Sequence, residues 1–494
     1  MKLAAVALFV LVAAWTASST SPGIAGEAPP PEPPLTYGVE PNLPVAVAAR
    51  RVCRLVADNP AAADATVLGV DGAASVVAGG QQYWLFGDTF RHGPGGRRDV
   101  IPAGLATSTD FDGHDCVDLT FKTDADGIVT PMFPRSDETT AWPDGALALP
   151  DGNIMFYMVK TYRQSPTEWH VGTIGLGVIP PGSFSGTRLV ERIWDAGSGF
   201  HGTLAGARSP VLIGDNVLVY INTDAGNYLA RAPLERIGEA SAYTYWDGGN
   251  WSAHPDEAQA LWTPEPSPLP SDNGLSVTFN EHLGKWLAVY NADFWSVKVR
   301  LADQPWGPWS QPITWFDCQP LAGEHYPYCY SSAIHGELSP HDGSTIYVTF
   351  ANPEPYDVSL VELRLGVAIH AWTGERKVVR YGPVRPDGSY TDAGVAFYAS
   401  DAALPGLVPI YEFTSAGAYR YALDAPSPVA TPAFFAYGTP STGAVHTRPL
   451  YRWQRDGEEI LDTADRDGWV RGEIAFQVPC IDVIRNGTGT ECAS

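Results

Sequence analysis

The hydrophobic positions of this sequence fall in short runs rather than at helical spacing. Runs of β-branched and aromatic residues are bounded by glycine and proline, of which the chain has 50 and 43. Such punctuated runs are typical of β-strands joined by turns. A helical period is nearly absent. The pattern therefore predicts an all-β protein.

One unit recurs along the chain: a turn signal, an aromatic-rich run and then polar residues. Its copies are GG before QQYWLFGD, PDG before NIMFYMVK, GD before NVLVYINTD, LG before KWLAVYNAD and DG before STIYVTFAN. The central aromatics, which we call the anchor aromatics, are spaced 71, 63, 70 and 60 residues apart: Phe86, Tyr157, Tyr220, Tyr290 and Phe350. This period fits blades of four strands, so we expect a five-bladed β-propeller over residues 40–370. A sandwich with long loops would explain the strands but not their regular recurrence.

The sequence changes character after Ala371. The stretches GVAFYASD, PIYEF, AFFAYG, PLYRWQRDG and EIAFQV indicate a second, shorter set of repeats. They loosely resemble the Tyr-rich repeat modules of secreted bacterial proteins. We expect a small β-rich accessory domain over residues 371–494. Carbohydrate binding and plain structural packing both remain open for it.

The N-terminus has the order of a secretory signal peptide. Lys2 precedes the apolar run Leu3–Ala14, which is shorter than the about 20 residues of a spanning helix. Residues 1–27 are therefore predicted to be a signal peptide and residues 28–39 a stiff Pro-rich linker. The formal net charge of -24 makes nucleic acid and anionic membranes poor partners. A neutral polysaccharide meets no such repulsion. The sequence leaves the oligomeric state open.

The six cysteines suit an exported protein with disulfides. Cys318 with Cys329, Cys480 with Cys492, and Cys53 with Cys116 form the simplest of 15 possible pairings. Zinc binding is the rival interpretation, but the chain has no C-x-x-C and no H-E-x-x-H. We predict no metal site and no cofactor, and leave a structural calcium ion open.

Two aspartates in the first repeat are the leading catalytic candidates. Gly79-Gly80 is a favourable two-residue hairpin turn. With that turn, residues whose numbers sum to 159 face each other, so Asp71 lies opposite Asp88 on one face of the sheet, with Cβ atoms about 4.5–5.5 Å apart. A slip of one residue would place them on opposite faces, and an aspartate at a strand end often only caps a turn.

Two carboxyls so close should share one negative charge, because the pKa of one of them is raised. A general acid beside an ionised carboxylate is what glycoside hydrolysis requires. Carboxyl separations of about 5–5.5 Å indicate retention and about 6.5–9.5 Å inversion. Direct pairing favours the shorter distance, but side-chain splay can open it, so the stereochemical outcome stays open.

Around these residues the sequence resembles glycoside hydrolase family 183, formerly a domain of unknown function (4185). The similar segments include LGVDGAASVVAGGQQYWLFGDTF (68–90), IPAGLATSTDFDG (101–113), WPDGALALPDGNIMFYM (142–158), GLSVTFNEHLGKWLAVYN (274–291) and HGELSPHDGSTIYVTFA (335–351). The resemblance implies a five-bladed propeller, endo-D-arabinanase activity and catalytic aspartates at Asp71 and Asp88. Relatives usually read more like Thr-Gly-Thr-Asp-Leu-Gly at the first aspartate, so the substrate is less determined than the catalysis.

Further polar residues occupy comparable repeat positions. Glu337 and His335 open the last repeat, where Glu337 is either a third acid or a solvated strand end. The other cleft candidates are Asp144, Arg208, Asp224 and Asp293. Sugar rings stack on aromatic faces, so Trp142, Trp246, Trp251 and Trp295 are possible platforms, although most of the 16 tryptophans are expected to pack in blades.

These observations predict a secreted glycoside hydrolase that cleaves arabinan-like (D-arabinofuranosyl) cell-wall polysaccharide with a pair of aspartates. The alternatives are a non-catalytic glycan-binding propeller and another propeller glycosidase such as an arabinofuranosidase. A sialidase is a weaker alternative because only Arg208 and Arg231 are obvious ligands for a sugar carboxylate. Endo or exo action stays open.

Overall fold

The computed structural model describes residues 42–133, 140–165, 168–195, 200–264, 273–322, 329–339, 343–375, 378–415, 417–427, 429–441, 444–455 and 458–480. The predicted signal peptide and Pro-rich linker lie outside these residues. Within the described part of the chain, no helix is both long and apolar enough to cross a membrane.

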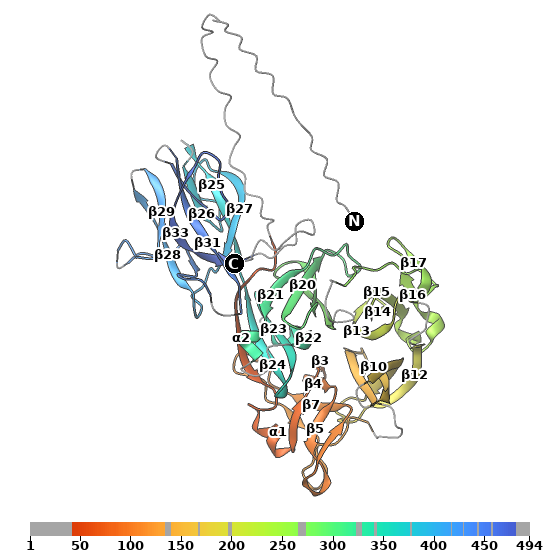
Figure 1. Ribbon diagram of the computed structural model, residues 1–494. Coiled ribbons are helices and arrows are strands. Elements are labelled where there is room, and N and C mark those ends of the chain that lie inside the picture. The colour runs from red at the N-terminus through yellow and green to blue at the C-terminus, as the bar shows by residue number, and fades with distance from the viewer. Residues whose placement is uncertain are drawn as a thin grey trace, which may run out of the picture. The chain divides into compact units, whose positions relative to one another are not determined.

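Five antiparallel sheets follow one another along the chain (Figure 1). Sheet 1 contains β3 (Ala74–Ala78), β4 (Gln81–Phe86), β7 (Gly104–Ser108) and β8 (Thr120–Phe121). Sheet 2 contains β9 (Thr140–Ala148), β10 (Ile154–Ser165), β11 (Glu168–Ile179) and β12 (Thr187–Asp195). Sheet 3 contains β13 (Leu204–Ile213), β14 (Asn216–Thr223), β15 (Asn227–Pro233), β16 (Thr244–Trp246) and β17 (Trp251–Ser252).

Sheets 4 and 5 complete this series. Sheet 4 contains β18 (Asn273–Asn280), β19 (Lys285–Asn291), β20 (Ser296–Ala302) and β21 (Ile313–Asp317). Sheet 5 contains β22 (Tyr330–Ile334), β23 (Thr345–Pro353), β24 (Tyr356–Leu365) and, at its outer edge, β1 (Ala46–Arg54) from the beginning of the described chain. Two short helices, α1 (Pro60–Asp64) and α2 (Gln319–Ala322), lie in the connections.

The five predicted repeats correspond to the second strand of each sheet: β4, β10, β14, β19 and β23. The anchor aromatics of these strands are all fully buried. Burying a large aromatic side chain contributes roughly 1.5–3 kcal/mol. Each repeat therefore packs its aromatic anchor into a hydrophobic cluster that also contains residues of a neighbouring sheet.

The innermost strands lie beside one another in the order β3, β9, β13, β18 and β22. Sheets arranged radially around a common centre form a β-propeller. The last sheet is completed by the first strand, because β1 pairs with β24 along Ala46–Arg54. The predicted all-β propeller fold followed by a small β-rich domain is confirmed.

A three-stranded ribbon extends from sheet 1. It consists of β2 (Val67–Val70), β5 (Thr89–His92) and β6 (Arg98–Ile101). Since β4 runs into β5 after a short break, the first hairpin belongs to two sheets in succession. The break between them contains Asp71 and Asp88.

The C-terminal residues form three further sheets of three strands each. Their aromatic core contains Tyr381, Phe397, Tyr421, Phe434 and Phe476. Gly366 separates β24 from the first strand of this module, so the predicted boundary at residue 370 falls inside that strand. The strands are β25 (Val367–Thr373), β26 (Val379–Gly382), β27 (Thr391–Ala399), β28 (Val408–Ser415), β29 (Ala418–Ala422), β30 (Phe434–Ala436), β31 (Thr447–Arg455), β32 (Glu458–Asp462) and β33 (Val470–Pro479).

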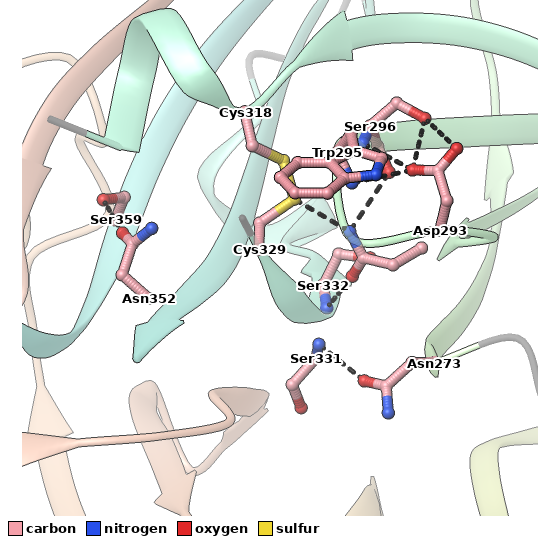
Figure 2. Close-up of a disulfide and its surroundings, with 11 residues drawn as sticks. Asn273, Asp293, Trp295, Ser296, Cys318, Cys329, Ser331, Ser332, Asn352 and Ser359 are labelled. Atoms are coloured by element: carbon pink, nitrogen blue, oxygen red, sulfur yellow. Dashed lines mark hydrogen bonds between the residues drawn. A yellow bond between two sulfur atoms is a disulfide. The ribbon is translucent and has the colours of Figure 1, made fainter. Parts of the chain in front are cut away.

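Two of the three expected disulfides lie within the described residues. Cys53 is bonded to Cys116, and Cys318 is bonded to Cys329 (Figure 2). The third expected pair includes Cys492, which lies outside the described residues.

Candidate active site

A cavity of about 570 Å³ lies at the centre of the propeller. The innermost strands of all five sheets contribute to its wall. A cleft of this size, lined by a few convergent polar groups, is the usual form of a ligand site.

Four of the five innermost strands are irregular where they reach this cavity, and the fifth, β3, begins just after the break that contains Asp71. The pairing of β9, β13, β18 and β22 with the next strand shifts register there. Ser209, Gly274 and Ser331 have positive φ angles at three of these shifts. Such bulges bend a strand and re-aim its side chains. A polar residue next to each irregularity lines the cavity: Asp71, Asp144, Arg208, Asn273 and Tyr330.

The predicted opposition of Asp71 and Asp88 is present in the backbone. The β3–β4 ladder and the β2–β5 ladder have the same register on the two sides of the break. Between them, the Asp71 N–H donates to the Asp88 carbonyl at 3.2 Å, and the Gly87 N–H donates to the Asp71 carbonyl at 2.7 Å. The two aspartates are therefore cross-strand neighbours.

Each carboxyl of this pair has its own hydrogen-bond donors. The hydroxyl of Tyr356 and, at 3.3 Å, that of Tyr330 donate to Oδ2 of Asp71. The indole N–H of Trp142 donates to Oδ1 of Asp88 at 2.8 Å. Asp88 is half-buried, and its neighbours Gly87 and Trp142 line the cavity.

The environment of Asp71 favours its protonated form. Burial has the largest effect on its pKa and raises it, because a low dielectric penalises the charged form. The negative charge of Asp88 raises it further, while the hydrogen bonds from Tyr356 and Tyr330 partly oppose the rise. The resulting pKa is about 7 instead of the ordinary 3.8. Asp71 can therefore carry a proton at neutral pH.

Gly87 makes this packing possible. A side chain on Gly87 would overlap Oδ1 of Asp71, far inside van der Waals contact. The absence of a Cβ thus leaves room for the Asp71 carboxyl beside the opposite strand.

Asp144 and Arg208 form an ion pair on neighbouring inner strands. The guanidinium Nη1 lies 2.7 Å from Oδ1 of Asp144, and the side chains are only 6% and 16% exposed. The Ala207 N–H donates to the other oxygen at 2.9 Å. Burial raises the pKa of Asp144, whereas Arg208 and this backbone donor oppose the rise. The pair lines the cavity with a fixed charge of each sign.

Glu337 approaches the cavity from the end of β22. It lies in a short helical turn, η5 (Gly336–Leu338), and its carboxylate accepts from the hydroxyl of Ser75. His335 is fully buried, with Nδ1 at 2.5 Å from the Ser75 hydroxyl and Nε2 at 2.7 Å from that of Thr349. Burial alone would raise the pKa of Glu337, but His335 and Ser75 together hold it below its ordinary value. Glu337 and Ser75 line the cavity, and His335 supports them from behind.

Asp88 and His335 adjoin residues that line this cavity, whereas Asp224, Asp293 and Trp295 lie away from it. Asp224 accepts from the Thr203 N–H at 2.7 Å, and Asp293 accepts from the N–H groups of Trp295 and Ser296, both at 2.8 Å. Both carboxylates therefore cap turns of their own sheets. Trp295 lies near Asp293 (Figure 2) and is 52% exposed. The two residues line a separate cavity of about 280 Å³.

The predicted tryptophan platforms divide in the same way. Trp142 lines the central cavity. Trp246 and Trp251 pack against each other at 5.4 Å between ring centroids and belong to the packing of sheet 3.

The sequence analysis missed several polar residues of the site. Among them are Tyr330 and Tyr356, which donate hydrogen bonds to Asp71, together with Ser75 and Asn273. One signal could have found Tyr330 and Asn273. The residues Asp71, Asp144, Arg208, Asn273 and Tyr330 follow one another at intervals of 73, 64, 65 and 57 residues, close to the intervals between the anchor aromatics.

Fold and site together define an all-β propeller protein with a half-buried pair of aspartates beside its central cavity. Residues 57–362 match the family model described as Domain of unknown function (DUF4185). The match spans more than half of the 494 residues, and the chain belongs to this family. No curated protein matches the chain.

Several solved structures are similar to the chain at low identity. A Bacteroides ovatus protein described as a candidate hydrolase has a TM-score of 0.45 and 13% identity, covering 60% of this chain and 85% of its own. A family 117 glycoside hydrolase from Zobellia galactanivorans has a TM-score of 0.41 and 10% identity, covering 66% of this chain and 92% of its own. An α-L-arabinofuranosidase from Podospora anserina has a TM-score of 0.37 and 10% identity, covering 65% of this chain and 98% of its own. At these scores the similarity carries no argument about activity.

Proposed function

We propose that this chain is a glycoside hydrolase in which Asp71 and Asp88 share the acid–base chemistry. We also propose that it is a five-bladed enzyme of glycoside hydrolase family 183, acting on arabinan-like D-arabinofuranosyl polysaccharide. The observation that supports catalysis is the environment of Asp71. Its carboxyl lines the central cavity beside a second carboxylate, that of Asp88, and has a pKa of about 7. Strongly perturbed carboxyls in a cleft are typical of functional sites.

The proposed reaction divides the work between the two aspartates. Protonated Asp71 donates its proton to the glycosidic oxygen as the bond from that oxygen to the anomeric carbon breaks. Ionised Asp88 is the second carboxylate that this chemistry needs, as base or as nucleophile. Trp142 fixes Asp88 through its indole N–H and lies in the cavity wall, where its ring can pack against a sugar face.

The cavity favours a neutral substrate. Glu337 and the pair at Asp71 and Asp88 give its wall a negative character, and Arg208, the cation of the wall, is already paired with Asp144. An anionic sugar would meet repulsion there. Neutral furanosyl residues with several hydroxyls can instead donate hydrogen bonds to these carboxylates.

The direct test is hydrolysis by the purified full chain. It is incubated with mycobacterial arabinogalactan, plant arabinan and a sialoside, and new reducing ends are measured. We expect release from the D-arabinofuranosyl polymer only. Asp71→Asn and Asp88→Asn should each lower the rate at least about 100-fold while leaving the fold intact. Asp303→Asn, which changes an exposed ion pair with Lys285, is the matched control and should keep full activity.

Two results would contradict this proposal. Full activity in both aspartate variants would remove the pair from the mechanism. Tight binding of the polysaccharide by the wild-type chain without any release of reducing ends would support a glycan-binding propeller instead.

We also propose that the protein is exported through residues 1–27. The disulfides Cys53–Cys116 and Cys318–Cys329 support an oxidising destination. N-terminal sequencing of protein recovered outside the cytoplasm should show cleavage near residue 27. An uncleaved N-terminus on that material would contradict the signal peptide.

A further inference from the structure

We propose that Tyr330 and Tyr356 are positioning residues that bind one oxygen of Asp71 and so assign its transferable proton to the other oxygen, Oδ1, beside Gly87. This inference rests on the proposed function and deepens it. It names the atom that carries the proton and the two residues that place it there.

The hydrogen bonds show which oxygen is occupied. Both tyrosine hydroxyls donate to the same atom, Oδ2 of Asp71. A neutral carboxyl has one O–H, and an oxygen that accepts two donors acts as the acceptor of the group. The proton of neutral Asp71 therefore resides on Oδ1. That oxygen lies against Gly87, and both residues line the cavity.

Tyr356 is held by contacts that do not involve Asp71. Its backbone carbonyl lies so close to Gly69 of β2 that a Cβ there would overlap it. Its ring packs edge-on against Phe90 of β5, with ring centroids 4.7 Å apart. The ribbon that leads into the aspartate pair thus also fixes the tyrosine that binds it.

Tyr330 is held by the start of β22. It directly follows Cys329, which is bonded to Cys318 (Figure 2). The next residue, Ser331, donates its backbone N–H to Asn273 of sheet 4 at 2.6 Å. After it, Ser332 donates to Asn291 at 2.9 Å. Since this backbone is tied to a neighbouring sheet and to a disulfide, the phenol has a fixed position before any substrate binds.

The two phenols also suit the charge that develops during the reaction. When Oδ1 gives its proton to the glycosidic oxygen, the electron pair of the breaking bond goes to that oxygen and Asp71 becomes a carboxylate. The donors on Oδ2 stabilise the new negative charge. Water then supplies a hydroxyl to the anomeric carbon, and its remaining proton restores the single proton of the aspartate pair. The pKa of Tyr356 lies far above its ordinary value, so it remains a donor throughout.

The first test follows the pH profile of kcat/KM for Tyr330→Phe, Tyr356→Phe and the double variant. Each phenol lowers the pKa of Asp71, so its loss should move the alkaline limb upward by about one pH unit. We expect the double variant to move further, with kcat lowered and KM nearly unchanged. Tyr347→Phe is the matched control, because Tyr347 also belongs to sheet 5 and donates to a carboxylate, Glu362, at 3.0 Å. The alkaline limb of the pH profile of Tyr347→Phe should stay where it is in the wild-type protein.

A second readout separates this inference from the proposed function. The full chain is labelled with ¹³C at aspartate carboxyls, and the Asp71 signal is assigned by its loss in Asp71→Asn. Its titration should shift upward in Tyr356→Phe and in Tyr330→Phe, whether or not any glycan is cleaved. An unchanged or lowered Asp71 pKa in both variants would overturn the positioning role. An upward shift in a chain that cleaves no glycan would leave that role standing and reject the proposed hydrolase.

Discussion

The three carboxyl environments of the cavity differ in the kind of donor that each carboxyl has. Asp144 is bound by the guanidinium of Arg208, and Glu337 is supported by His335 and Ser75. Asp71 is bound by neutral phenols. A cation or a set of strong donors lowers the pKa of a buried carboxyl, whereas neutral phenols beside another negative charge leave it able to bind a proton near neutrality. Burial and the charge of Asp88 outweigh the two phenols, so Asp71 is the carboxyl of these three that can be the acid.

The raised pKa of Asp71 should lower the free energy of unfolding at neutral pH. The pKa of Asp71 is raised in the folded state, so between about pH 4 and 7 the unfolded chain is ionised there while the folded chain is not. The contribution of Asp71 to the free energy of unfolding therefore falls as pH rises from about 4 to 7, and it stays at the lower value above pH 7. Asp71→Asn removes the penalty, which is at most about 4 kcal/mol. Thermal unfolding should show the variant gaining Tm relative to wild type as pH rises from 4 to 8. A gain that is equal at both pH values, or absent, would contradict this reasoning.

Arg208 should stabilise the fold because it pairs with the buried carboxyl of Asp144. Arg208→Met leaves Asp144 buried without its cation, and such a loss typically costs about 3–5 kcal/mol. Arg236→Met is the control, because it breaks an exposed pair with Glu239 and should cost less than about 1 kcal/mol. Urea unfolding measures both. If the ion pair is the cause, adding Asp144→Leu to Arg208→Met should recover most of the loss. Equal costs for the two arginine variants would contradict it.

At the scale of single elements, the first hairpin was the most predictable part of the site. Its Gly79-Gly80 turn fixes the register, and the period of two then places Asp71 opposite Asp88 across a break in the ladder. The tyrosines could not be predicted in this way. They lie 259 and 285 residues from Asp71 along the chain and reach it only because sheet 5 packs beside sheet 1.

The position of a strand within its sheet decides which of the predicted site residues line the cavity. The sequence pattern located the second strand of each sheet, whose buried aromatics repeat most clearly. In a radial sheet only the innermost strand faces the centre. Asp224 and Asp293 follow second strands and cap their own turns, whereas Asp144 and Arg208 belong to first strands and line the cavity. Periodicity alone does not distinguish these two positions.

The close approach of inner strands gives a test at the level of an element. Gly274 of β18 has φ +66°, and a Cβ there would overlap the backbone of Ser331 and Ser332 in β22. Gly274→Ala should therefore cost about 1–3 kcal/mol for overpacking beyond its backbone strain. Gly284→Ala is a close control, because Gly284 has φ +62° but open space around its Cβ position. Unfolding in urea should separate the two variants, and equal losses would show that packing between the strands has no part in the effect.

At the scale of the whole molecule, the site lies where the ring of sheets closes. Asp71 and Ser75 come from the beginning of sheet 1, and their partners Tyr330, Tyr356 and Glu337 come from sheet 5. Sheet 5 is itself completed by β1, which returns from the start of the described chain. The proposed catalytic site therefore depends on chain closure, whereas the packing of sheets 2 to 4 involves only consecutive segments.

The disulfide between Cys53 and Cys116 lies at this closure. Cys53 belongs to β1, whereas Cys116 lies between β7 and β8 of sheet 1, with 63 residues separating the two cysteines. Replacing both by serine should cost about 2–5 kcal/mol. Because the bond links sheet 5 to sheet 1, the loss should be local at first. Hydrogen exchange followed by mass spectrometry should show lower protection in β1 and β24 and little change in β14 and β19.

Activity should follow that local loosening. Asp71 and its tyrosines lie on opposite sides of the closure, so the serine variant should lose hydrolysis at temperatures below its global unfolding transition. Active-site geometry needs to be held within about 0.5 Å, which a loosened closure does not provide. If protection falls equally in all five sheets, the bond stabilises the propeller as a whole. If activity instead persists up to the unfolding transition, the aspartate pair does not depend on the closed ring.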